Sequence, residues 1–453
     1  MTIATMLRTA PAKTAIAASI ALGLSLGLVS SSYAGAREQA YRIYSRLTGT
    51  PPTNTMLAAM TACITNVASS ACTTAASSNG ITGISDGKVM ATYLAMQDAN
   101  NPNFLNVVVK NMVMPWTNKD QTVFAPLNDT AATLIGLIRD GADFRQALYA
   151  DVIYVGDPTK LPADVPAYSA SDNKHYIQIE HDNLDLRSVL KKVSQTNVDP
   201  SHPLPAEAIS GALTTRQSAR AFFYAGTNRA MFRFTMLNYL CADLEQIKDV
   251  TRVPDRVRQD PSRSPGGDSS VFLNNCVGCH AGMDGMDGAY AYYNWGPAVF
   301  DPNADPETQS MTYLTAPVTY TLTGVTFTSR VVPKYRQNFS NFPYGYFATD
   351  DSWINYWRTG PNAKLGWANN SPQQPVRNDP NNTSLGSMAQ LGQELADTTA
   401  FARCQVIKTY RHVCFNDPSE STLQTIVNDF TAGNKYNMLT VFSDAAIDCS
   451  NGL

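Results

Sequence analysis

The sequence predicts a mainly α-helical protein with a bundle-like body and a small β-hairpin insertion. Apolar residues recur at helical spacing through most of residues 35–150. The same spacing returns near the C-terminus, over about 389–447. Between these regions, a Thr- and Val-rich stretch over 318–332 predicts the hairpin, with Thr323 and Gly324 in its turn.

The N-terminal helices are marked by residues that favour helix ends. In the first helix, Tyr41, Tyr44 and Leu47 recur at helical spacing. We expect Gly49, Pro51 and Pro52 to stop this helix and Thr53 to cap the next one. Either Asp129 or Thr130 is the expected N-terminal cap of a later helix over 131–139.

The middle of the chain reads as loops and shorter elements. Residues 155–205 are rich in Pro, Asp, Ser and Asn, which predicts a loop with one short strand from His175 to His181. The expected elements after it are helices over 206–224 and 229–247, a turn-forming stretch over 261–270, a loop over 359–387, and helices over 389–414, 419–431 and 436–447.

The first 34 residues resemble a secretory signal peptide. Arg8 and Lys13 give a positive start, an apolar run covers 15–29, and Ser32-Tyr33-Ala34 offers small residues for cleavage. Removing the two basic residues with this leader changes the formal net charge from −3 to −5. We therefore expect a periplasmic or extracellular, cell-surface protein with no integral membrane segment in the mature chain and no nucleic-acid partner.

The most informative motif is Cys276-Val277-Gly278-Cys279-His280, which has the spacing C-x-x-C-H. This spacing is the attachment signature of a covalent haem c. Residues i, i+3 and i+4 of a helical turn share one face, so two thiols and an imidazole can reach one porphyrin. A zinc half-site would need a second Cys/His pair, which the sequence lacks, and a redox dithiol would need a βαβ context. We therefore expect one covalently attached haem c with His280 as the proximal iron ligand.

The remaining six cysteines suit an oxidising compartment. Cys63 and Cys72 are close enough in sequence for a local disulfide. Cys404 and Cys414 lie on one predicted helix about 15 Å apart, beyond the limit of about 7 Å for a disulfide. Each should therefore bond elsewhere. The favoured pairs are Cys241–Cys404 and Cys414–Cys449, with the swapped pairing open as the alternative.

Further residues around the motif and near the C-terminus form a pattern. They are Leu240-Cys241, Met283-Asp284, Gly288-Ala289, Tyr293-Asn294, Leu391 to Ala396, Phe401-Ala402-Arg403-Cys404 and Tyr410-Arg411. In these residues the chain resembles the modular haem-c (cytochrome c) proteins of planctomycetes and proteobacteria, over about 205–300 and 385–445. Gly285 stands where that family usually has Pro. The resemblance implies an exported protein with a cytochrome c-like haem module.

These observations predict five segments. They are a signal peptide (1–34), an N-terminal helical domain with a loop-rich segment (35–204), a haem-attachment module (205–300), a loop and hairpin insertion (301–384) and the C-terminal helical part of the haem module (385–453).

The sixth iron ligand determines what a haem can do. His175, which follows a flexible loop, and Met388, which precedes the last long helices, are the two candidates. His412 is interpreted as a packed core histidine and His202 as an exposed loop residue. The aromatic residues expected to pack against the porphyrin are Tyr290, Tyr292, Tyr293 and Trp295.

These features predict an exported monohaem cytochrome that transfers electrons between periplasmic or surface partners, including a redox partner protein. The alternative is a single-haem enzyme of peroxidase or oxygenase type with an open distal site, for which the sequence assigns no catalytic residue. A third hypothesis is a scaffold protein in which the haem is structural.

Overall fold

The computed structural model describes residues 35–224, 228–251, 270, 274–299, 301, 303–322, 324–336, 348–367 and 387–451. The expected signal peptide and most of the turn-forming stretch over 261–270 lie outside the described residues.

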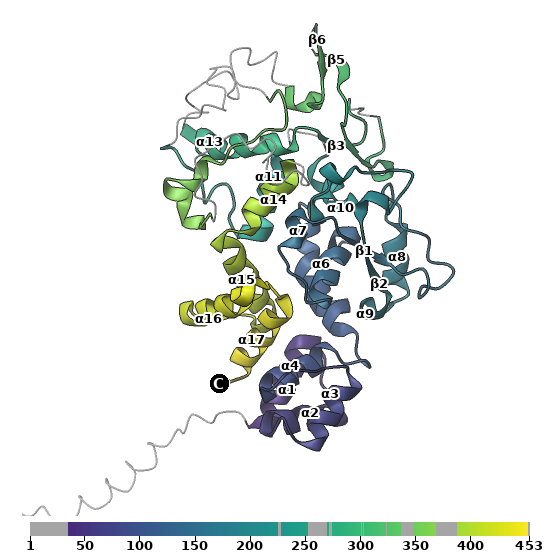
Figure 1. Cartoon of the computed structure of the whole chain (residues 1–453), viewed down its shortest axis with the longest axis vertical. Coiled ribbons are helices and arrows are strands. Elements are labelled where there is room, and N and C mark those ends of the chain that lie inside the picture. The colour runs from purple at the N-terminus through teal and green to yellow at the C-terminus, as the bar shows by residue number, and fades with distance from the viewer. Residues whose placement is uncertain are drawn as a thin grey trace, which may run out of the picture.

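The protein is mainly α-helical, as predicted (Figure 1). The α-helices are α1 (Ala36–Thr48), α2 (Asn54–Thr65), α3 (Ser70–Ser78), α4 (Gly87–Met96), α5 (Lys110–Val113), α6 (Asp129–Arg139), α7 (Gln146–Tyr149), α8 (Lys174–His181), α9 (Leu186–Val189), α10 (Arg216–Phe222), α11 (Arg229–Leu240), α13 (Val277–Met286), α14 (Ser387–Ala396), α15 (Thr399–Cys414), α16 (Glu420–Thr431) and α17 (Met438–Asn451).

Small antiparallel sheets accompany the helices. The pairs are β1 (Ile153–Gly156) with β2 (Leu190–Val193), β3 (Tyr293–Trp295) with β4 (Met311–Tyr313), and β5 (Val318–Leu322) with β6 (Val325–Ser329). The last pair confirms the predicted hairpin. Its strands close at Leu322 opposite Val325, and Gly324 in the turn has a φ of 83°, which glycine adopts without strain.

Two of the predicted N-terminal helix ends are confirmed, and one cap is shifted. Gly49 ends α1 in the left-handed conformation, and the Thr53 hydroxyl accepts a hydrogen bond from the Met56 amide at the start of α2. Helix α6 is capped by Asn128, whose side-chain oxygen accepts from the Ala131 amide at 3.0 Å. The expected caps Asp129 and Thr130 therefore lie inside the helix, because the asparagine before them takes the capping position.

The strand predicted over residues 175–181 is wrong, because this stretch forms helix α8. Tyr176 and Ile179 are three residues apart and both buried, so the apolar pattern that resembled strand alternation is one face of a short helix.

Three predicted helices are shorter than expected. The helix over 229–247 stops at Leu240, because Cys241 adopts a left-handed conformation with a φ of 53°. The stretch 389–414 is two helices, and Thr398 caps the second through the Phe401 amide. Only Arg216–Phe222 of the stretch 206–224 is α-helical.

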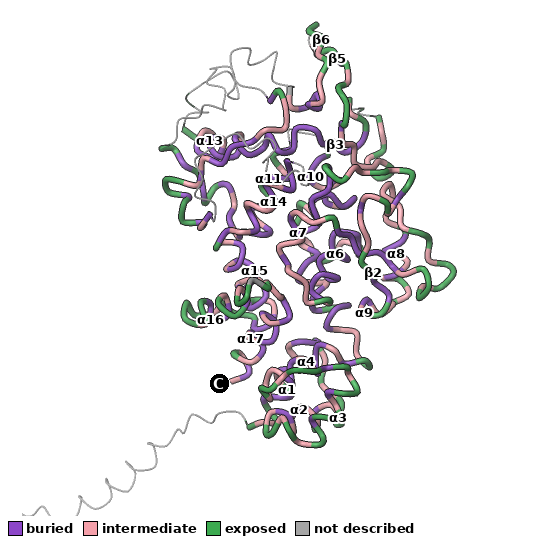
Figure 2. The backbone as a smooth tube through the Cα atoms, viewed as in Figure 1, coloured by how far each residue is buried: buried purple, intermediate pink, exposed green. Residues whose placement is uncertain are grey.

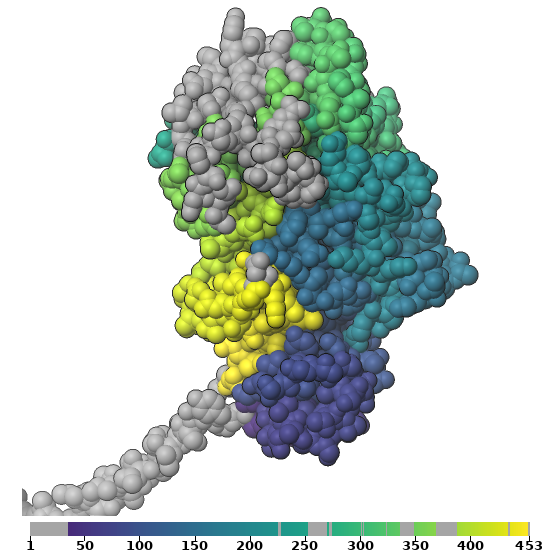
Figure 3. Space-filling model, in the orientation of Figure 1, coloured from purple at the N-terminus to yellow at the C-terminus, as the bar shows by residue number. Residues whose placement is uncertain are grey.

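The two ends of the chain pack together. Helix α17 contacts α1, α4 and α15, and α15 contacts α11 (Figures 1 and 3). One hydrophobic core contains buried residues from Ala40 to Ala446 (Figure 2). This core contains residues from all four segments expected after residue 34. The segment boundaries expected at residues 204, 300 and 384 therefore stay predictions.

The three favoured disulfides are present, and the swapped pairing is not. The Cα–Cα distances are 4.8 Å for Cys63–Cys72, 5.2 Å for Cys241–Cys404 and 5.7 Å for Cys414–Cys449. The second disulfide fixes the end of α11 to α15. Across the described ranges, no helix combines the length and the apolar character that crossing a membrane requires.

The disulfide that joins α11 to α15 should contribute more stability than the local one. We expect the double variant Cys241→Ala/Cys404→Ala to lower the free energy of unfolding by about 2 to 5 kcal/mol, because the bond closes a long loop in the unfolded chain. Cys63→Ala/Cys72→Ala is the control, with a loss about 2 kcal/mol smaller. Denaturant titration measures both, and an equal or larger loss in the control would contradict the prediction.

Candidate haem attachment site

The C-x-x-C-H motif begins helix α13. Cys276 is its N-terminal cap residue, and the His280 amide donates to the Cys276 carbonyl at 3.2 Å, which closes the first turn around the motif. Cys276 is half-buried and Cys279 is buried. Both are free thiols, while the other six cysteines are paired. Burial raises the pKa of the Cys279 thiol, and the nearby Glu245 carboxylate adds to that effect.

Helix α13 has two chemically different faces. Cys276, His280, Asp284 and Asp287 follow one another at intervals of four, four and three residues, so they share a face. The opposite face carries Gly278, Gly282, Gly285 and Gly288. We call these the ligand face and the glycine face.

Three residues of the glycine face, Gly282, Gly285 and Gly288, pack directly against residues 351–358, which we call the strap; Gly278 packs against residues 248–250. A Cβ atom on Gly282 would lie 2.0 Å from the Trp357 ring, and one on Gly288 would lie 2.0 Å from the Ser352 carbonyl oxygen. The Ile354 amide donates to the Gly285 carbonyl at 2.7 Å. The backbone of α13 therefore meets the strap backbone and the Trp357 ring directly, and side chains larger than hydrogen do not fit at these positions without displacing the strap.

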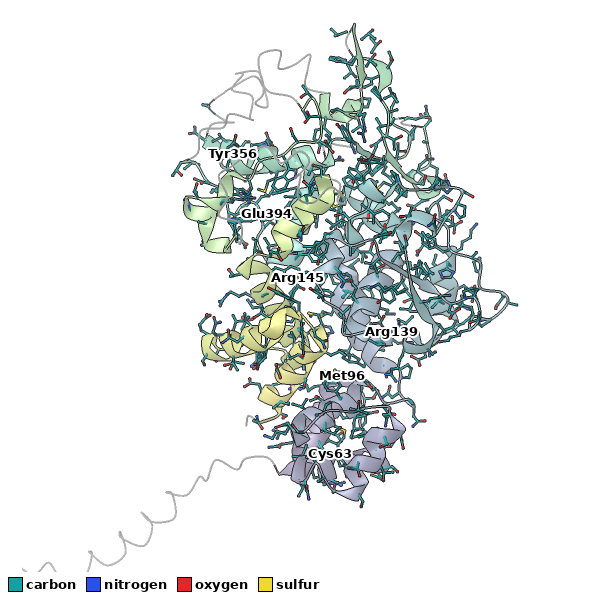
Figure 4. The ribbon with its side chains drawn as sticks, viewed as in Figure 1. Cys63, Met96, Arg139, Arg145, Tyr356 and Glu394 are labelled. Atoms are coloured by element: carbon teal, nitrogen blue, oxygen red, sulfur yellow. A yellow bond between two sulfur atoms is a disulfide. The ribbon has the colours of Figure 1, made fainter. Side chains whose placement is uncertain are left out.

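Helix α14 holds the strap in place (Figure 4). Arg358 pairs with Glu394 at 2.7 Å, and their side chains are only 8% and 6% exposed. The Asn355 amide donates to the same carboxylate at 3.0 Å. A buried ion pair of this kind strongly disfavours arrangements that separate its partners, so the strap has one position on α14.

The His280 ring is oriented by a carboxylate on its own helix. Its Nδ1 lies 2.8 Å from Oδ1 of Asp284, one turn further along the ligand face. With the proton on Nδ1 donated to Asp284, the lone pair of the neutral imidazole is on Nε2, the nitrogen that can bind iron.

A cavity of about 540 Å³ lies on the side of residues 243–245. Its lining residues are Lys119, Arg229, Ala230, Arg233, Phe234, Asp243, Leu244 and Glu245. The Cys279 thiol donates to the Leu244 carbonyl at 3.3 Å, so Cys279 contacts one lining residue without being part of the lining itself. Arg233 pairs with Asp243 at 2.7 Å, whereas Lys119 and Arg229 form no ion pair with any described residue.

These residues fit a covalent haem. Two free thiols and an imidazole whose Nδ1 contacts a carboxylate lie within the first turn of one helix, and the nearby cavity carries two cations, Lys119 and Arg229, that have no ion-pair partner among the described residues and would suit the anionic propionates of a porphyrin. No described cluster of three or more His, Cys, Asp or Glu side chains could hold a metal ion on its own.

The sequence interpretation did not assign a role to two residues of the ligand face. Asp284 entered only as part of a family pattern, although its spacing of four residues from His280 predicts a contact on a helix. Asp287 is buried, and its Oδ1 has no hydrogen-bond partner in the described chain. Burial, and then the charge of Asp284, raise the pKa of Asp287 well above its usual value.

His175 does not lie where the iron would be. The Gly156 amide donates to its Nε2 at 2.9 Å, and its Nδ1 donates to the Pro166 carbonyl at 2.6 Å. Both ring nitrogens are therefore used within the segment around α8, which Figure 1 shows well apart from α13. In this structure both ring nitrogens of His175 are used in hydrogen bonds within the protein, which does not favour it as an iron ligand; the identity of the sixth ligand stays a prediction.

Met388 lies on the strap side of α13. It follows Ser387, whose hydroxyl donates to the Asp351 carbonyl in the strap, and its side chain is buried in the core. Its role as a sixth iron ligand stays a prediction. His412 is a packed core histidine, as interpreted, because its Nε2 hydrogen bonds to the Val108 carbonyl at 2.8 Å.

The aromatic residues after the motif pack against other side chains of the protein. Tyr293 stacks on Phe223 with 5.5 Å between ring centroids, and Tyr292 contacts Tyr313. The indole nitrogen of Trp295 donates to the Pro306 carbonyl. These contacts connect the end of α13 to α10 and β4.

Compared with known protein families, with curated proteins and with solved structures, the chain gives no match. The resemblance to modular haem-c proteins therefore stays a prediction.

The glycine face predicts an unusual response to alanine. Replacing a helical glycine by alanine normally stabilises a helix by about 1 kcal/mol. At Gly282 we expect a loss of about 1 to 3 kcal/mol in unfolding free energy instead, because the added methyl group meets Trp357. In a double-mutant cycle with Trp357→Ala, the combined loss should be smaller than the sum. Gly282→Ala as stable as the parent chain would refute this contact.

Replacing His175 should lower the stability of the protein and leave the spectrum of the haem unchanged. His175→Ala leaves the Gly156 amide unpaired, so we expect a loss of about 1 to 3 kcal/mol at pH 7.5 with an unchanged haem spectrum. His181→Ala, an exposed histidine on the same helix, is the control and should change little.

The contribution of His175 should also depend on pH. Burial lowers its pKa, against the opposite effect of the hydrogen bond to Pro166. The unfolded chain therefore takes up the proton first, at about pH 6.5. Stability should be full above that pH and fall as the pH drops below it. Denaturant titrations at pH 5 and 7.5 measure this slope, which His175→Ala should reduce and His181→Ala should retain.

Proposed function

We propose that the protein is an exported c-type cytochrome with one covalent haem, bound through Cys276 and Cys279 and ligated by His280, that transfers electrons between periplasmic or surface partners. The observation that carries the proposal is the state of the eight cysteines. Six form disulfides, and the two that stay free are the two of the C-x-x-C-H motif, at the start of one helix.

The surroundings of the motif support an electron-transfer role. When bound, a haem c supplies a one-electron Fe(III)/Fe(II) couple. The half-buried Cys276 and the exposed Lys119 and Arg229 lie near the surface, where a redox partner protein can approach. The strap and α14 hold the opposite face of α13 by backbone packing and a buried ion pair, so the residues that bind the haem need not move between oxidation states.

Each residue has a separate part in this proposal. Cys276 and Cys279 provide the thioether links, and His280 provides Nε2 to the iron while Asp284 accepts its Nδ1 proton. Lys119 and Arg229, which line the nearby cavity, would hold the propionates. The disulfides support the expected oxidising compartment outside the cytoplasm.

A second candidate function is a single-haem enzyme of peroxidase or oxygenase type. The contact between His280 and Asp284 favours it, because an electron-rich proximal ligand promotes cleavage of an O–O bond. The cavity beside Cys279 offers room for a small substrate.

The proposal predicts a covalent haem that depends on two cysteines only. Expressed with its leader in a host competent in cytochrome c maturation, the protein should carry the mass of one haem after denaturation. Cys276→Ala/Cys279→Ala should remove this mass, whereas Cys63→Ala/Cys72→Ala should keep it. Protein with the mass of bare polypeptide from such a host would end the proposal.

The same preparation separates the two functions. A six-coordinate, low-spin iron that does not bind CO or react with peroxide supports electron transfer. A high-spin ferric iron that reacts with peroxide favours the enzyme instead.

A further inference from the structure

We infer that Asp284 is a positioning residue that makes His280 an electron-rich iron ligand and thereby lowers the midpoint potential of the haem. This inference rests on the proposed function, since it concerns the proximal side of the same haem.

The contact is direct and well shielded from water. Asp284 Oδ1 lies 2.8 Å from His280 Nδ1, and the two side chains are 18% and 16% exposed. Both residues are on the ligand face of α13 at a spacing of one turn, so the helix itself sets their separation. The glycine face behind them is fixed to the strap, which keeps the whole helix in one position.

A carboxylate in this position changes the ligand electronically. As Asp284 accepts the Nδ1 proton in a charge-assisted hydrogen bond, negative charge builds up on the imidazole ring and Nε2 becomes a stronger donor. Ferric iron carries one more positive charge than ferrous iron, so it gains more from that donor. The ferric state is therefore favoured and the midpoint potential falls.

Other charged groups near the ligand face do not replace Asp284. Asp287 lies one turn further along α13, and burial favours its neutral form. Glu245 lines the cavity and lies close enough to Cys279 to influence its pKa, but it is exposed to solvent. Arg229, near Cys279 and Asp287, carries the opposite charge. In the described structure, Asp284 is the carboxylate in contact with the imidazole.

The consequence for function concerns the direction of electron flow. A haem with a lowered potential is reduced only by a strong donor and passes its electron readily to an acceptor of higher potential. The carboxylate of Asp284 would therefore favour electron flow from this haem to a partner of higher potential.

The test is a spectroelectrochemical titration of the full-length holoprotein. It compares removal of the carboxylate that contacts His280 with removal of other carboxyl groups nearby. In Asp284→Asn, the Fe(III)/Fe(II) equilibrium should shift at least tenfold toward Fe(II), which is a rise of about 59 mV for a one-electron couple. Asp284→Glu keeps the carboxylate and should recover at least half of this shift. Glu245→Gln removes a charge beside the cavity, and Asp287→Asn removes a buried carboxyl; each should shift the equilibrium less than threefold.

A second measurement covers the case in which Asp284→Asn does not retain haem. In the parent protein with diamagnetic ferrous iron, nuclear magnetic resonance should show a strongly hydrogen-bonded Nδ1 proton on His280. The absence of that proton signal, an unmoved potential in Asp284→Asn, or an equal shift in Glu245→Gln would each overturn the inference. A parent protein without haem would instead overturn the proposed function.

Discussion

The arrangement around the motif depends on one steric constraint, the absence of side chains on the glycine face of α13. Gly282, Gly285 and Gly288 let the strap approach to backbone contact, and a single methyl group at two of these positions would overlap Trp357 or Ser352. The strap is fixed in turn by Glu394 of α14, through a buried ion pair and an amide hydrogen bond. A helix that carries free thiols and a ligand histidine near the surface is thus attached to the core of the protein from behind.

Because of this constraint, the two faces of α13 have different roles. Glycines on one face make the close contacts with the strap, so the side chains of Cys276, His280 and Asp284 are left on the other. The helix then sets the spacing from Cys276 to His280 and from His280 to Asp284. The contact between His280 and Asp284 is local to the helix, so the element that carries the motif also supplies the carboxylate beside its imidazole.

Local patterns predicted much of the fold and only part of the site. Helix spacing, the Thr53 cap and the β5–β6 hairpin are properties of neighbouring residues. The length of a helix between Cys404 and Cys414 excluded a bond between these two, and the structure decides between the two pairings that this left open. The strand expected over 175–181 failed because eight residues with two buried apolar positions fit either period. The strap was not predictable, because it meets α13 across about 70 residues of sequence and glycine leaves no apolar signal. The hydrogen bonds of His175 were not predictable for a similar reason, since its partners Gly156 and Pro166 are set by the tertiary structure.

The charges around the cavity connect the site to the rest of the molecule. The chain without its first 34 residues has a formal net charge of −5, counted by removing Arg8 and Lys13 from a total of −3. Against this acidic background, Lys119 and Arg229 are two cations without ion-pair partners in the described chain, and they line a cavity together with Leu244, whose carbonyl accepts a hydrogen bond from Cys279. An unpaired cation near a low-dielectric wall gains from an anion, and a haem attached at Cys276 and Cys279 brings two carboxylates. The same porphyrin would therefore satisfy the thiols, the imidazole and these two cations together, which neither a local disulfide nor a zinc ion at the motif would do.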